Sequence, residues 1–410
     1  MKVVILGIDG YLGWPLALHL ISHGHEVCGV DDFSRRKYVK DLECDSLTPI
    51  KSWPERAAEL INLHPSFAFT SLSLGRSLPS HIETFLNHMQ PDAIVHLAEM
   101  PSAPWSMESV ELASLTQYTN VIGTLHLLWA MHKVCPNAHL VKLGTMGEYG
   151  TPECDIPEGK IPEECIGGHV ESIAADLSKD FIYKCPMSGL EFPRKPGSFY
   201  HLSKVHDTYN IEFCCRNWNL SSTDIMQGPV FGVTTASMYN REELITRFDY
   251  DEVFGTVINR FCAQALLGHP LTVYGEGGQT RGYLPIIDSM ACITLAIENP
   301  PEPGEYRTFN QFERTYSINE LAEIVSEAAH DCGIETTIAH YENPRKEAET
   351  HYYNPAREKL IKLGYRPTTD ITGEVTRLIK DLKPYTHRLN SHLVVPRTRW
   401  DTQHRTSEII

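Results

Sequence analysis

The feature that most constrains the fold is a glycine-rich turn between a buried strand and a helix near the start of the chain. The strand is the short β-branched run VVIL at residues 3–6, and the turn contains Gly7, Gly10 and Gly13. Glycines at this spacing permit a tight turn, close approach of a pyrophosphate and close packing of the next helix. The free N–H groups and positive dipole end of that helix favour an anion. Taken alone, such a triplet can also be a structural turn without a ligand.

A second strand, which ends at Asp31 in EVCGVDD, indicates what the turn holds. Asp31 lies 24 residues beyond Gly7 (31 − 7), where an acid can accept hydrogen bonds from a ribose diol. The same carboxylate would repel a 2′-phosphate, so the pattern favours NAD over NADP. Arg35 and Arg36 weaken this preference slightly. The beginning of the chain therefore predicts an NAD site.

Strands and helices alternate through the rest of the first half. DAIVHLAE (92–99) and HLVKLGT (139–145) are further buried strands, and residues 108–134 have a long helical period. The alternation predicts an α/β fold, a doubly wound parallel sheet of the Rossmann type with helices on both faces. A stretch rich in Pro, Gly and Glu at 151–198 breaks the pattern, and we interpret it as an inserted lid-like loop. We expect the NAD-binding domain to span residues 1–230.

The second half mixes shorter strands and helices, and this mixture predicts a second, smaller α/β lobe over residues 231–410. Helical periods occur at 251–268, 286–298, 317–333 and 356–363, and LTVYG is a short strand. We expect residues 286–300 to return to the Rossmann domain.

The composition narrows the possible partners. The chain of 410 residues has a formal net charge of −16 and is 42% hydrophobic, which argues against nucleic acid or an anionic membrane surface as its main partner. No apolar run reaches the length of a transmembrane helix, and the chain opens on a strand pattern without a leader. The 11 cysteines form no C-x-x-C pair and the 20 histidines no ligand set, so no metal is expected. A reducing, cytoplasmic compartment fits this pattern best.

A tyrosine and a lysine four residues apart, Tyr200 and Lys204 in FYHLSKVHD, are candidates for chemistry. By themselves they are more often a surface pair on one helical face. Thr145, however, follows a predicted strand end in GTMGEYG. A lysine ammonium lowers the pKa of a nearby phenol, so the phenolate can take a proton from a sugar hydroxyl while NAD takes the hydride. With the glycine turn, these residues resemble the extended short-chain dehydrogenases.

Longer blocks narrow the resemblance. GIDGYLGWPLALHL, LVKLGTMGEYGTP, SFYHLSKVHD, DYDEVFGTVINRFCAQALLGHPLTVYGEGGQTRGYL and NPRKEAETHYYN are similar to the UDP-sulfoquinovose synthase family over nearly the whole chain. The resemblance implies synthesis of UDP-6-sulfoquinovose from UDP-glucose and sulfite with tightly held NAD. It implies oxidation at C4, loss of water from C5–C6, sulfite addition to the enone and return of the hydride.

The resemblance also implies roles for individual residues. The catalytic set would be Thr145, which binds the 4-oxygen, Tyr200, the base for the C4 hydroxyl, and Lys204, which tunes the tyrosine and contacts the nicotinamide ribose. Residues 231–410 would mainly bind the nucleotide sugar. The cofactor would be held by Gly7, Asp9, Gly10, Tyr11, Leu12, Gly13, Asp31, Asp32, Arg36, Leu97, Ala98, Glu99, Asn120, Tyr200, Lys204, Gln227 and Val230. The substrate would be bound by Thr145, Gly147, His201, Tyr274, Arg281 and Arg345, with the two arginines on the UDP phosphates.

The chain departs from the family pattern next to the sugar. AEMPSAPWSM stands where the family has G-E-Q-R-S-A-P-Y-S-M, so Met100 and Pro101 replace a glutamine and an arginine. Three readings stay open: a divergent synthase, a related enzyme that eliminates water and adds no sulfite to give a 5,6-ene or 6-deoxy sugar, and a 4-epimerase. A non-enzymatic NAD-binding sensor is a fourth. Two long helices, near 108–134 and 200–218, predict a homodimer by analogy with related dehydrogenases.

Overall fold

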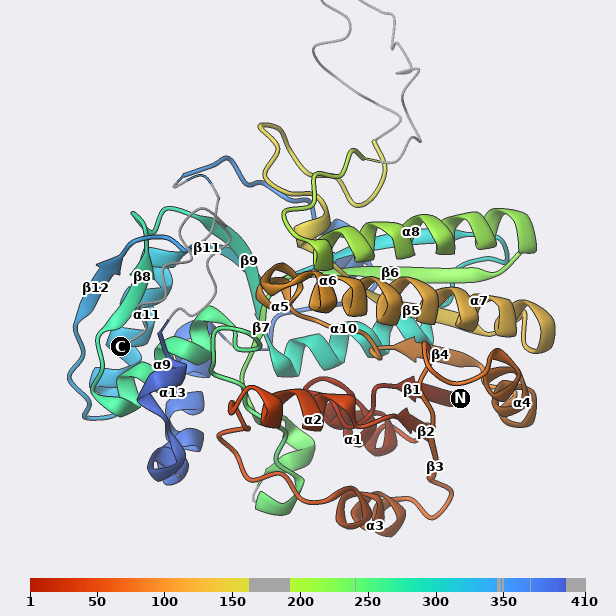
Figure 1. Cartoon of the computed structure of the whole chain (residues 1–410), viewed down its shortest axis with the longest axis horizontal. Helices are drawn as coiled ribbons and strands as arrows, with labels where there is room; N and C mark the ends of the chain where they lie inside the picture. The colour runs from red at the N-terminus through yellow and green to blue at the C-terminus, as the bar shows by residue number, and fades with distance from the viewer. Residues whose placement is uncertain (162–191, 240, 345–347, 349, 369, 396–410) are drawn as a thin grey trace, which may run out of the picture.

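The computed structural model describes residues 1–161, 192–239, 241–344, 348, 350–368 and 370–395. Within this part of the chain, a larger lobe is built around a parallel sheet and a smaller lobe lies against one end of it (Figure 1). Residues 162–191 of the predicted 151–198 loop and Arg345 lie outside the described residues. No helix within the described part of the chain has the length and apolarity that crossing a bilayer requires.

The larger sheet has seven strands in the order β10-β6-β5-β4-β1-β2-β3, and every neighbouring pair is parallel. This arrangement confirms the predicted doubly wound sheet. The strands are β1 (Lys2–Leu6), β2 (Glu26–Asp31), β3 (Ala68–Ser71), β4 (Ala93–His96), β5 (His139–Thr145), β6 (Ser221–Gln227) and β10 (Tyr306–Gln311).

Both faces of the sheet are buried, because successive side chains of a strand point to opposite faces. In β1, Val3 and Ile5 belong to one apolar core and Val4 and Leu6 to another. The first core is covered by α1 (Gly13–Ser22) and α10 (Ile286–Glu298), and the second by α4 (Pro79–Met89), α7 (Gly123–Val134) and α8 (Phe199–Trp218). This two-sided burial explains the nearly continuous apolar runs of the strand sequences.

The helical period predicted over 108–134 is confirmed, since the chain is helical from Val110 to Val134, and the structure adds a π-helical turn within it. α6 (Val110–Gln117) is capped by Ser109, whose hydroxyl accepts a hydrogen bond from the Leu112 N–H at 3.3 Å. A π-helical turn at Tyr118–Ile122 separates α6 from α7. Such turns are single wider turns inside an α-helix and often occur near functional sites. The remaining helices of this half are α2 (Ser34–Asp41), α3 (Trp53–Leu63) and α5 (Ala103–Glu108).

The smaller lobe has two short sheets and its own apolar core. One sheet has the order β11-β9-β7 and the other pairs β12 with β8. Its strands and helices are β7 (Val230–Phe231), α9 (Val257–Leu267), β8 (Leu271–Tyr274), β9 (Thr280–Pro285), β11 (Arg314–Ser317), α11 (Ile318–Asp331), β12 (Ile338–Tyr341) and α13 (Ile371–Leu382). The short helix α12 (Glu358–Lys362) packs on β10 of the larger lobe, whose core includes Leu360.

The chain crosses between the two lobes more than once. After β9 it returns to the larger lobe, where α10 covers the sheet and β10 becomes its edge strand beside β6. β11 then pairs with β9 in the smaller lobe. The space between the lobes is therefore bordered by segments that come from all parts of the sequence.

Candidate active site

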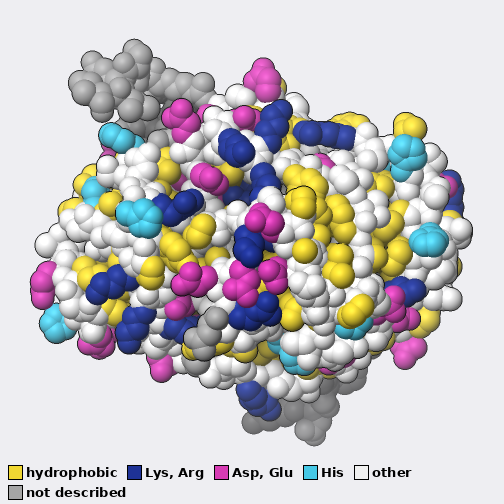
Figure 2. Space-filling view, turned by 90° about the horizontal axis from the view of Figure 1, so that it is seen from below, with side chains coloured by type: hydrophobic (Ala, Val, Ile, Leu, Met, Phe, Trp, Pro, Cys, Tyr) yellow, Lys and Arg dark blue, Asp and Glu magenta, His cyan; other side chains and the backbone are white. Residues whose placement is uncertain are grey.

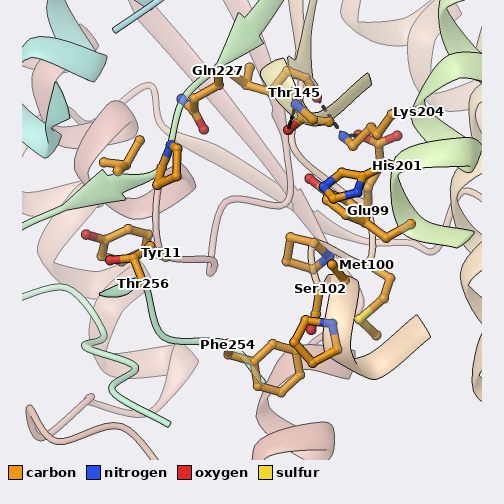
Figure 3. Close-up of a pocket in the computed structure, with 18 of the residues that line it drawn as sticks. Tyr11, Glu99, Met100, Ser102, Thr145, His201, Lys204, Gln227, Phe254 and Thr256 are labelled. Atoms are coloured by element: carbon orange, nitrogen blue, oxygen red, sulfur yellow. Dashed lines mark hydrogen bonds and ion pairs between the residues drawn. The ribbon is translucent and has the colours of Figure 1, made fainter. Parts of the chain in front are cut away.

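A cavity of about 810 Å³ opens at the carboxyl ends of the central strands, between the two lobes. In α/β sheets of this kind ligands bind at this edge, where the strand order reverses. Figure 3 shows Thr145, Lys204, His201 and Glu99 gathered on one side of the cavity, with Tyr11 and Thr256 across from them. Both lobes supply the wall, so a ligand in the cavity would contact both.

The glycine turn forms one end of the cavity, and its shape requires glycine. Gly7 has φ of 89°, and a Cβ there would lie 2.8 Å from the backbone carbon of Leu97. A Cβ at Gly13 would lie 2.1 Å from the Gly7 carbonyl oxygen. The turn therefore brings bare backbone to the cavity at the start of α1, where unpaired N–H groups can bind a pyrophosphate. The residues present fit a dinucleotide.

Asp31, at the end of β2, lines the same end of the cavity. Its carboxylate accepts hydrogen bonds from the backbone N–H groups of Asp9 (2.9 Å) and Phe33 (2.7 Å). Burial raises the pKa of Asp31 to about 6, although these two hydrogen bonds lower it. A partly buried carboxylate suits a ribose diol, so the prediction from its spacing stays a prediction that this geometry allows.

Arg36 corrects one prediction, because it is absent from the cavity wall that the described residues form. Its guanidinium donates to both carboxylate oxygens of Asp9, at 2.5 and 2.8 Å. Arg56 donates to Asp9 as well, at 2.9 Å, and is 1% exposed. Both arginines therefore bind Asp9 without lying on the described part of the cavity wall, and these ion pairs stabilise the glycine turn. Arg35 reaches the wall instead, where it pairs with Asp249 at 2.7 Å.

Thr145, Tyr200 and Lys204 come together on the wall of the cavity. Thr145 ends β5, and its hydroxyl accepts a hydrogen bond from the Gly147 N–H at 3.1 Å. Tyr200 stands in the first turn of α8, which begins after Ser198, a residue whose hydroxyl accepts from the His201 N–H at 3.2 Å. The Lys204 ammonium lies 5.9 Å from the centre of the Tyr200 ring. The spacing of Tyr200 and Lys204 in the sequence could not show that Thr145 lies on the same cavity wall.

The ionisation of this set depends on burial as well as on charge. Burial raises the pKa of Tyr200, and the Lys204 ammonium opposes the rise while Glu99 adds to it. The net direction corrects the expectation of a lowered pKa, since burial exceeds the effect of the lysine. Lys204 itself donates to the Leu143 carbonyl at 2.6 Å and forms an ion pair with Glu99.

Asn120 corrects a second prediction. It lies in the π-helical turn, is 0% exposed and is absent from the cavity wall that the described residues form. Its side chain bonds the backbone of Met100, accepting from the N–H at 2.7 Å and donating to the carbonyl at 3.2 Å, and donates to the Ser203 hydroxyl at 2.9 Å. Asn120 therefore fixes the segment after β4 against α8, behind the cavity wall.

The predicted substrate residues that the structure describes all line the cavity. A Cβ at Gly147 would lie 2.4 Å from the His201 ring, so this glycine allows the ring to pack on the loop after β5. Arg281 interacts with His351 and lies 5.9 Å from the centre of the Tyr353 ring. Arg260, which the sequence reasoning missed, lies 4.2 Å above the Tyr274 ring. Arg260 lies inside the block DYDEVFGTVINRFCAQALLGHPLTVYGEGGQTRGYL that carried the family resemblance, but its spacing alone gave it no role.

The remaining predicted cofactor residues line the cavity too: Tyr11, Leu12, Asp32, Leu97, Ala98, Glu99, Gln227 and Val230. Met100 and Pro101, which depart from the family pattern, also lie there. Met100 is 3% exposed and packs beside Trp105 and Tyr38, whereas Pro101 is exposed. The methionine therefore completes an apolar core behind the wall.

Comparison with known proteins identifies the class and then the family. The NAD dependent epimerase/dehydratase family model matches residues 3–167. The chain is 44% identical over 402 residues to the UDP-sulfoquinovose synthase of Sulfolobus acidocaldarius, covering 98% of each protein. It is 43% identical over 410 residues to the chloroplastic UDP-sulfoquinovose synthase of Spinacia oleracea, covering 97% of this chain and 79% of that one. The chain belongs to the UDP-sulfoquinovose synthase family, and it is an NAD-dependent nucleotide-sugar enzyme.

Solved structures support the fold. UDP-glucose 4-epimerase of Thermotoga maritima, solved with UDP-glucose, superposes with a TM-score of 0.66 at 19% identity, covering 94% of this chain and 99% of that one. UDP-glucuronic acid 4-epimerase of Bacillus cereus, solved with UDP-glucuronic acid and NAD, gives 0.65 at 18% identity, with the same coverage.

Proposed function

We propose that the protein makes UDP-6-sulfoquinovose from UDP-glucose and sulfite. The proposal is carried by the full-length identity to two synthases, together with an intact Thr145, Tyr200 and Lys204 set on the cavity wall. The same set argues against the sensor reading, because a protein that only binds NAD has no need of a buried base.

Each residue of the set has a chemical task. Bound NAD supplies the hydride acceptor and later the hydride donor for C4. The Tyr200 phenolic oxygen takes the proton of the C4 hydroxyl, and the Thr145 hydroxyl holds the same oxygen. Lys204 favours the phenolate through its charge. Once C4 is a ketone, the C5 proton is acidic; its loss expels water across C5–C6, and sulfite then adds at C6.

Product mass tests the proposal. UDP-glucose and sulfite together should give a sulfonated nucleotide sugar, and UDP-glucose alone should give none. A product that has lost water whether or not sulfite is present would instead support the sulfite-independent enzyme, which the change to Pro101 favours, since proline has no side-chain donor for an anion. UDP-galactose has the same mass as UDP-glucose, so it is identified by chromatography; its formation as the sole product would support the 4-epimerase.

The protein is proposed to act as a homodimer. Apolar side chains stand exposed on α7, α8 and the turn before α7: Trp129 (46%), Phe213 (50%), Tyr209 (45%) and Tyr118 (48%). α7 and α8 pack side by side, so a second copy could cover both with its own pair. Light scattering at micromolar concentration should give the mass of two chains.

On the face drawn in Figure 2, basic and acidic side chains are interspersed along the middle, which does not favour a polyanion there.

The cytoplasm is the proposed compartment. Every cysteine that the structure describes is a free thiol, and most of these are buried. Free thiols persist in reducing compartments. Fractionation of cells that produce the protein would test this placement.

A further inference from the structure

A group of buried charged side chains lies behind the Tyr200–Lys204 wall. Three of its ion pairs are Lys204 with Glu99, Lys142 with Asp224 at 3.9 Å, and Arg194 with Glu148 at 3.1 Å. Each of these six side chains is at most 5% exposed. Buried charges are tolerated when they are paired in this way.

Asp207 is a fourth carboxyl in this group and has no cation of its own. It lies on α8 one turn after Lys204 and is 0% exposed. Neither of its oxygens accepts a hydrogen bond from any donor in the described part of the chain. Its carboxyl lies within hydrogen-bonding range of Glu99, whose Oε1 atom likewise has no donor among the described residues. Two ionised carboxylates cannot hydrogen-bond, because both are acceptors.

We propose that Asp207 is a positioning residue: its carboxyl keeps a proton at neutral pH and donates it in a hydrogen bond to Glu99. With that proton the group has three negative and three positive charges, and Glu99 has a donor on each oxygen. Glu99 is then held in the orientation that pairs with Lys204. The lysine keeps its place beside Tyr200, and its charge is opposed by one carboxylate rather than two.

The surrounding groups agree with this assignment. From β4, His96 contacts Thr124 at 3.0 Å, and burial lowers the pKa of His96 to about 4, so it adds no charge. Burial and the Glu99 carboxylate raise the pKa of Asp207 well above its ordinary value, while Lys142 opposes the rise. Burial would raise the pKa of Glu99 too, but Lys204 brings it down to about 2.

The other carboxyls each have a cation beside them, although burial raises the pKa of Glu148 as well, against the effect of Lys142 and Arg194. Glu148, on the turn after β5, accepts from the Thr208 hydroxyl at 3.2 Å and pairs with Arg194. Asp224, on β6, accepts from the Tyr306 hydroxyl of β10 at 3.0 Å, and it shares the single Thr208 hydroxyl proton, at 2.7 Å, with Glu148. Of the four carboxyls, Asp207 is the one that has neither a paired cation nor a hydrogen-bond donor among the described residues, and the proton is assigned to it on that ground.

Infrared spectroscopy of the NAD-bound protein at neutral pH tests the protonation directly. The carbonyl stretch of a buried carboxylic acid should be present in the wild type and absent in Asp207→Asn. It should persist in Asp249→Asn, which removes a buried carboxylate paired with Arg35 and Arg247. A wild-type spectrum without a band that D207N removes would overturn the proposal.

Stability against pH gives a second readout that does not depend on turnover. In the folded protein Asp207 holds a proton that the unfolded chain releases above about pH 4. The wild type should therefore lose stability relative to D207N as pH rises from about 4 toward the raised folded pKa. A difference that is flat, or that favours the wild type as pH rises, would mean that Asp207 is ionised.

The positioning role rests on the proposed function only through Tyr200 as the base. Asp207→Ala should lower kcat about tenfold or more, and D207N, whose amide N–H can donate to Glu99, should restore most of the loss. Equal loss in both variants would overturn the positioning role even if the infrared band is present. If the wild type lacks turnover of UDP-glucose, the proposed function fails while the infrared and stability results still decide the protonation.

Discussion

At Tyr200 two effects of the surroundings act in opposite directions. Burial raises the pKa of the phenol, and the neighbouring Lys204 lowers it. Burial therefore disfavours the Tyr200 phenolate that acts as the base, and the phenolate depends on the Lys204 ammonium staying beside it. Removing the phenolic oxygen or moving the charge should have separate and measurable effects.

Tyr200→Phe should reduce turnover by about 10²-fold or more, because general base catalysis by the phenolate is lost. Bound NAD, measured by absorbance after denaturation, should stay at the wild-type level. Tyr209→Phe is the matched control, since Tyr209 is on the same helix and 45% exposed. Wild-type turnover in Y200F would contradict the assignment of the base.

Lys204→Met should move the rise of turnover with pH to higher pH. The Lys204 ammonium has the largest lowering effect on the pKa of Tyr200, so its removal leaves burial and Glu99, which raise that pKa, opposed only by the weaker effect of Lys142. The measurement is the pH profile of kcat for the wild type and the variant. An unchanged profile with lower kcat at every pH would show that the lysine acts by position alone.

The predicted residues that the structure places on the cavity wall include those whose proposed role depends on local backbone needs or fixed spacing. Gly7, Gly13 and Asp31 are of this kind. Arg36 and Asn120 were misassigned, because what their long or amide side chains contact depends on neighbours that only folding brings near. Glu99 and Asp207 are far apart in the sequence, and neither has a motif that predicts their contact.

Among the elements, the glycine turn and α3 work as one unit at the dinucleotide end of the cavity. Arg56 of α3 donates to Asp9 of the turn and to the Ile245 carbonyl of the smaller lobe at 3.3 Å. Its guanidinium also lies 4.4 Å from the Trp14 ring of α1. One buried cation thus joins three segments. The sequence predicted β1, the turn and the helix after it, because a continuous apolar run and glycine spacing mark them.

Gly13→Ala should abolish NAD binding, because its Cβ would lie 2.1 Å from the Gly7 carbonyl oxygen and displace the turn. Gly197→Ala serves as the control, as this glycine also lines the cavity but a Cβ there meets no atom within 4 Å. Isothermal calorimetry on NAD-free protein measures both. Retained affinity in G13A would mean that the turn can relax.

Arg56→Met should lower the free energy of unfolding by about 2 kcal/mol. The loss of stability stays smaller than for a buried carboxylate left without a partner, because Arg36 still pairs with Asp9. Urea unfolding compares it with Arg216→Met, whose side chain is 65% exposed and whose pair with Glu212 should contribute less than about 1 kcal/mol. Equal losses would argue against a joining role for Arg56.

At the scale of the whole molecule, the cavity exists because the two lobes share one chain that passes between them repeatedly. The alternation of strands and helices predicted the larger lobe, and the mixed second half predicted a smaller one. The order of the small sheets could not be predicted, because strands of two to six residues carry too little pattern to fix their partners. The long-range pairing of β11 with β9 and β12 with β8 is decided by packing in the folded state.

The late position of β10 has a consequence for synthesis. The larger sheet gains its last strand only when residues 306–311 have left the ribosome, although its first strand is made from residues 2–6. A nascent chain that ends near residue 230 should expose the apolar surface that α10 later covers, and arrest peptides of increasing length should report a pulling force only once Gln311 has emerged. A pulling force from the chain that ends near residue 230 would show that the amino-terminal half folds before α10 and β10 are made.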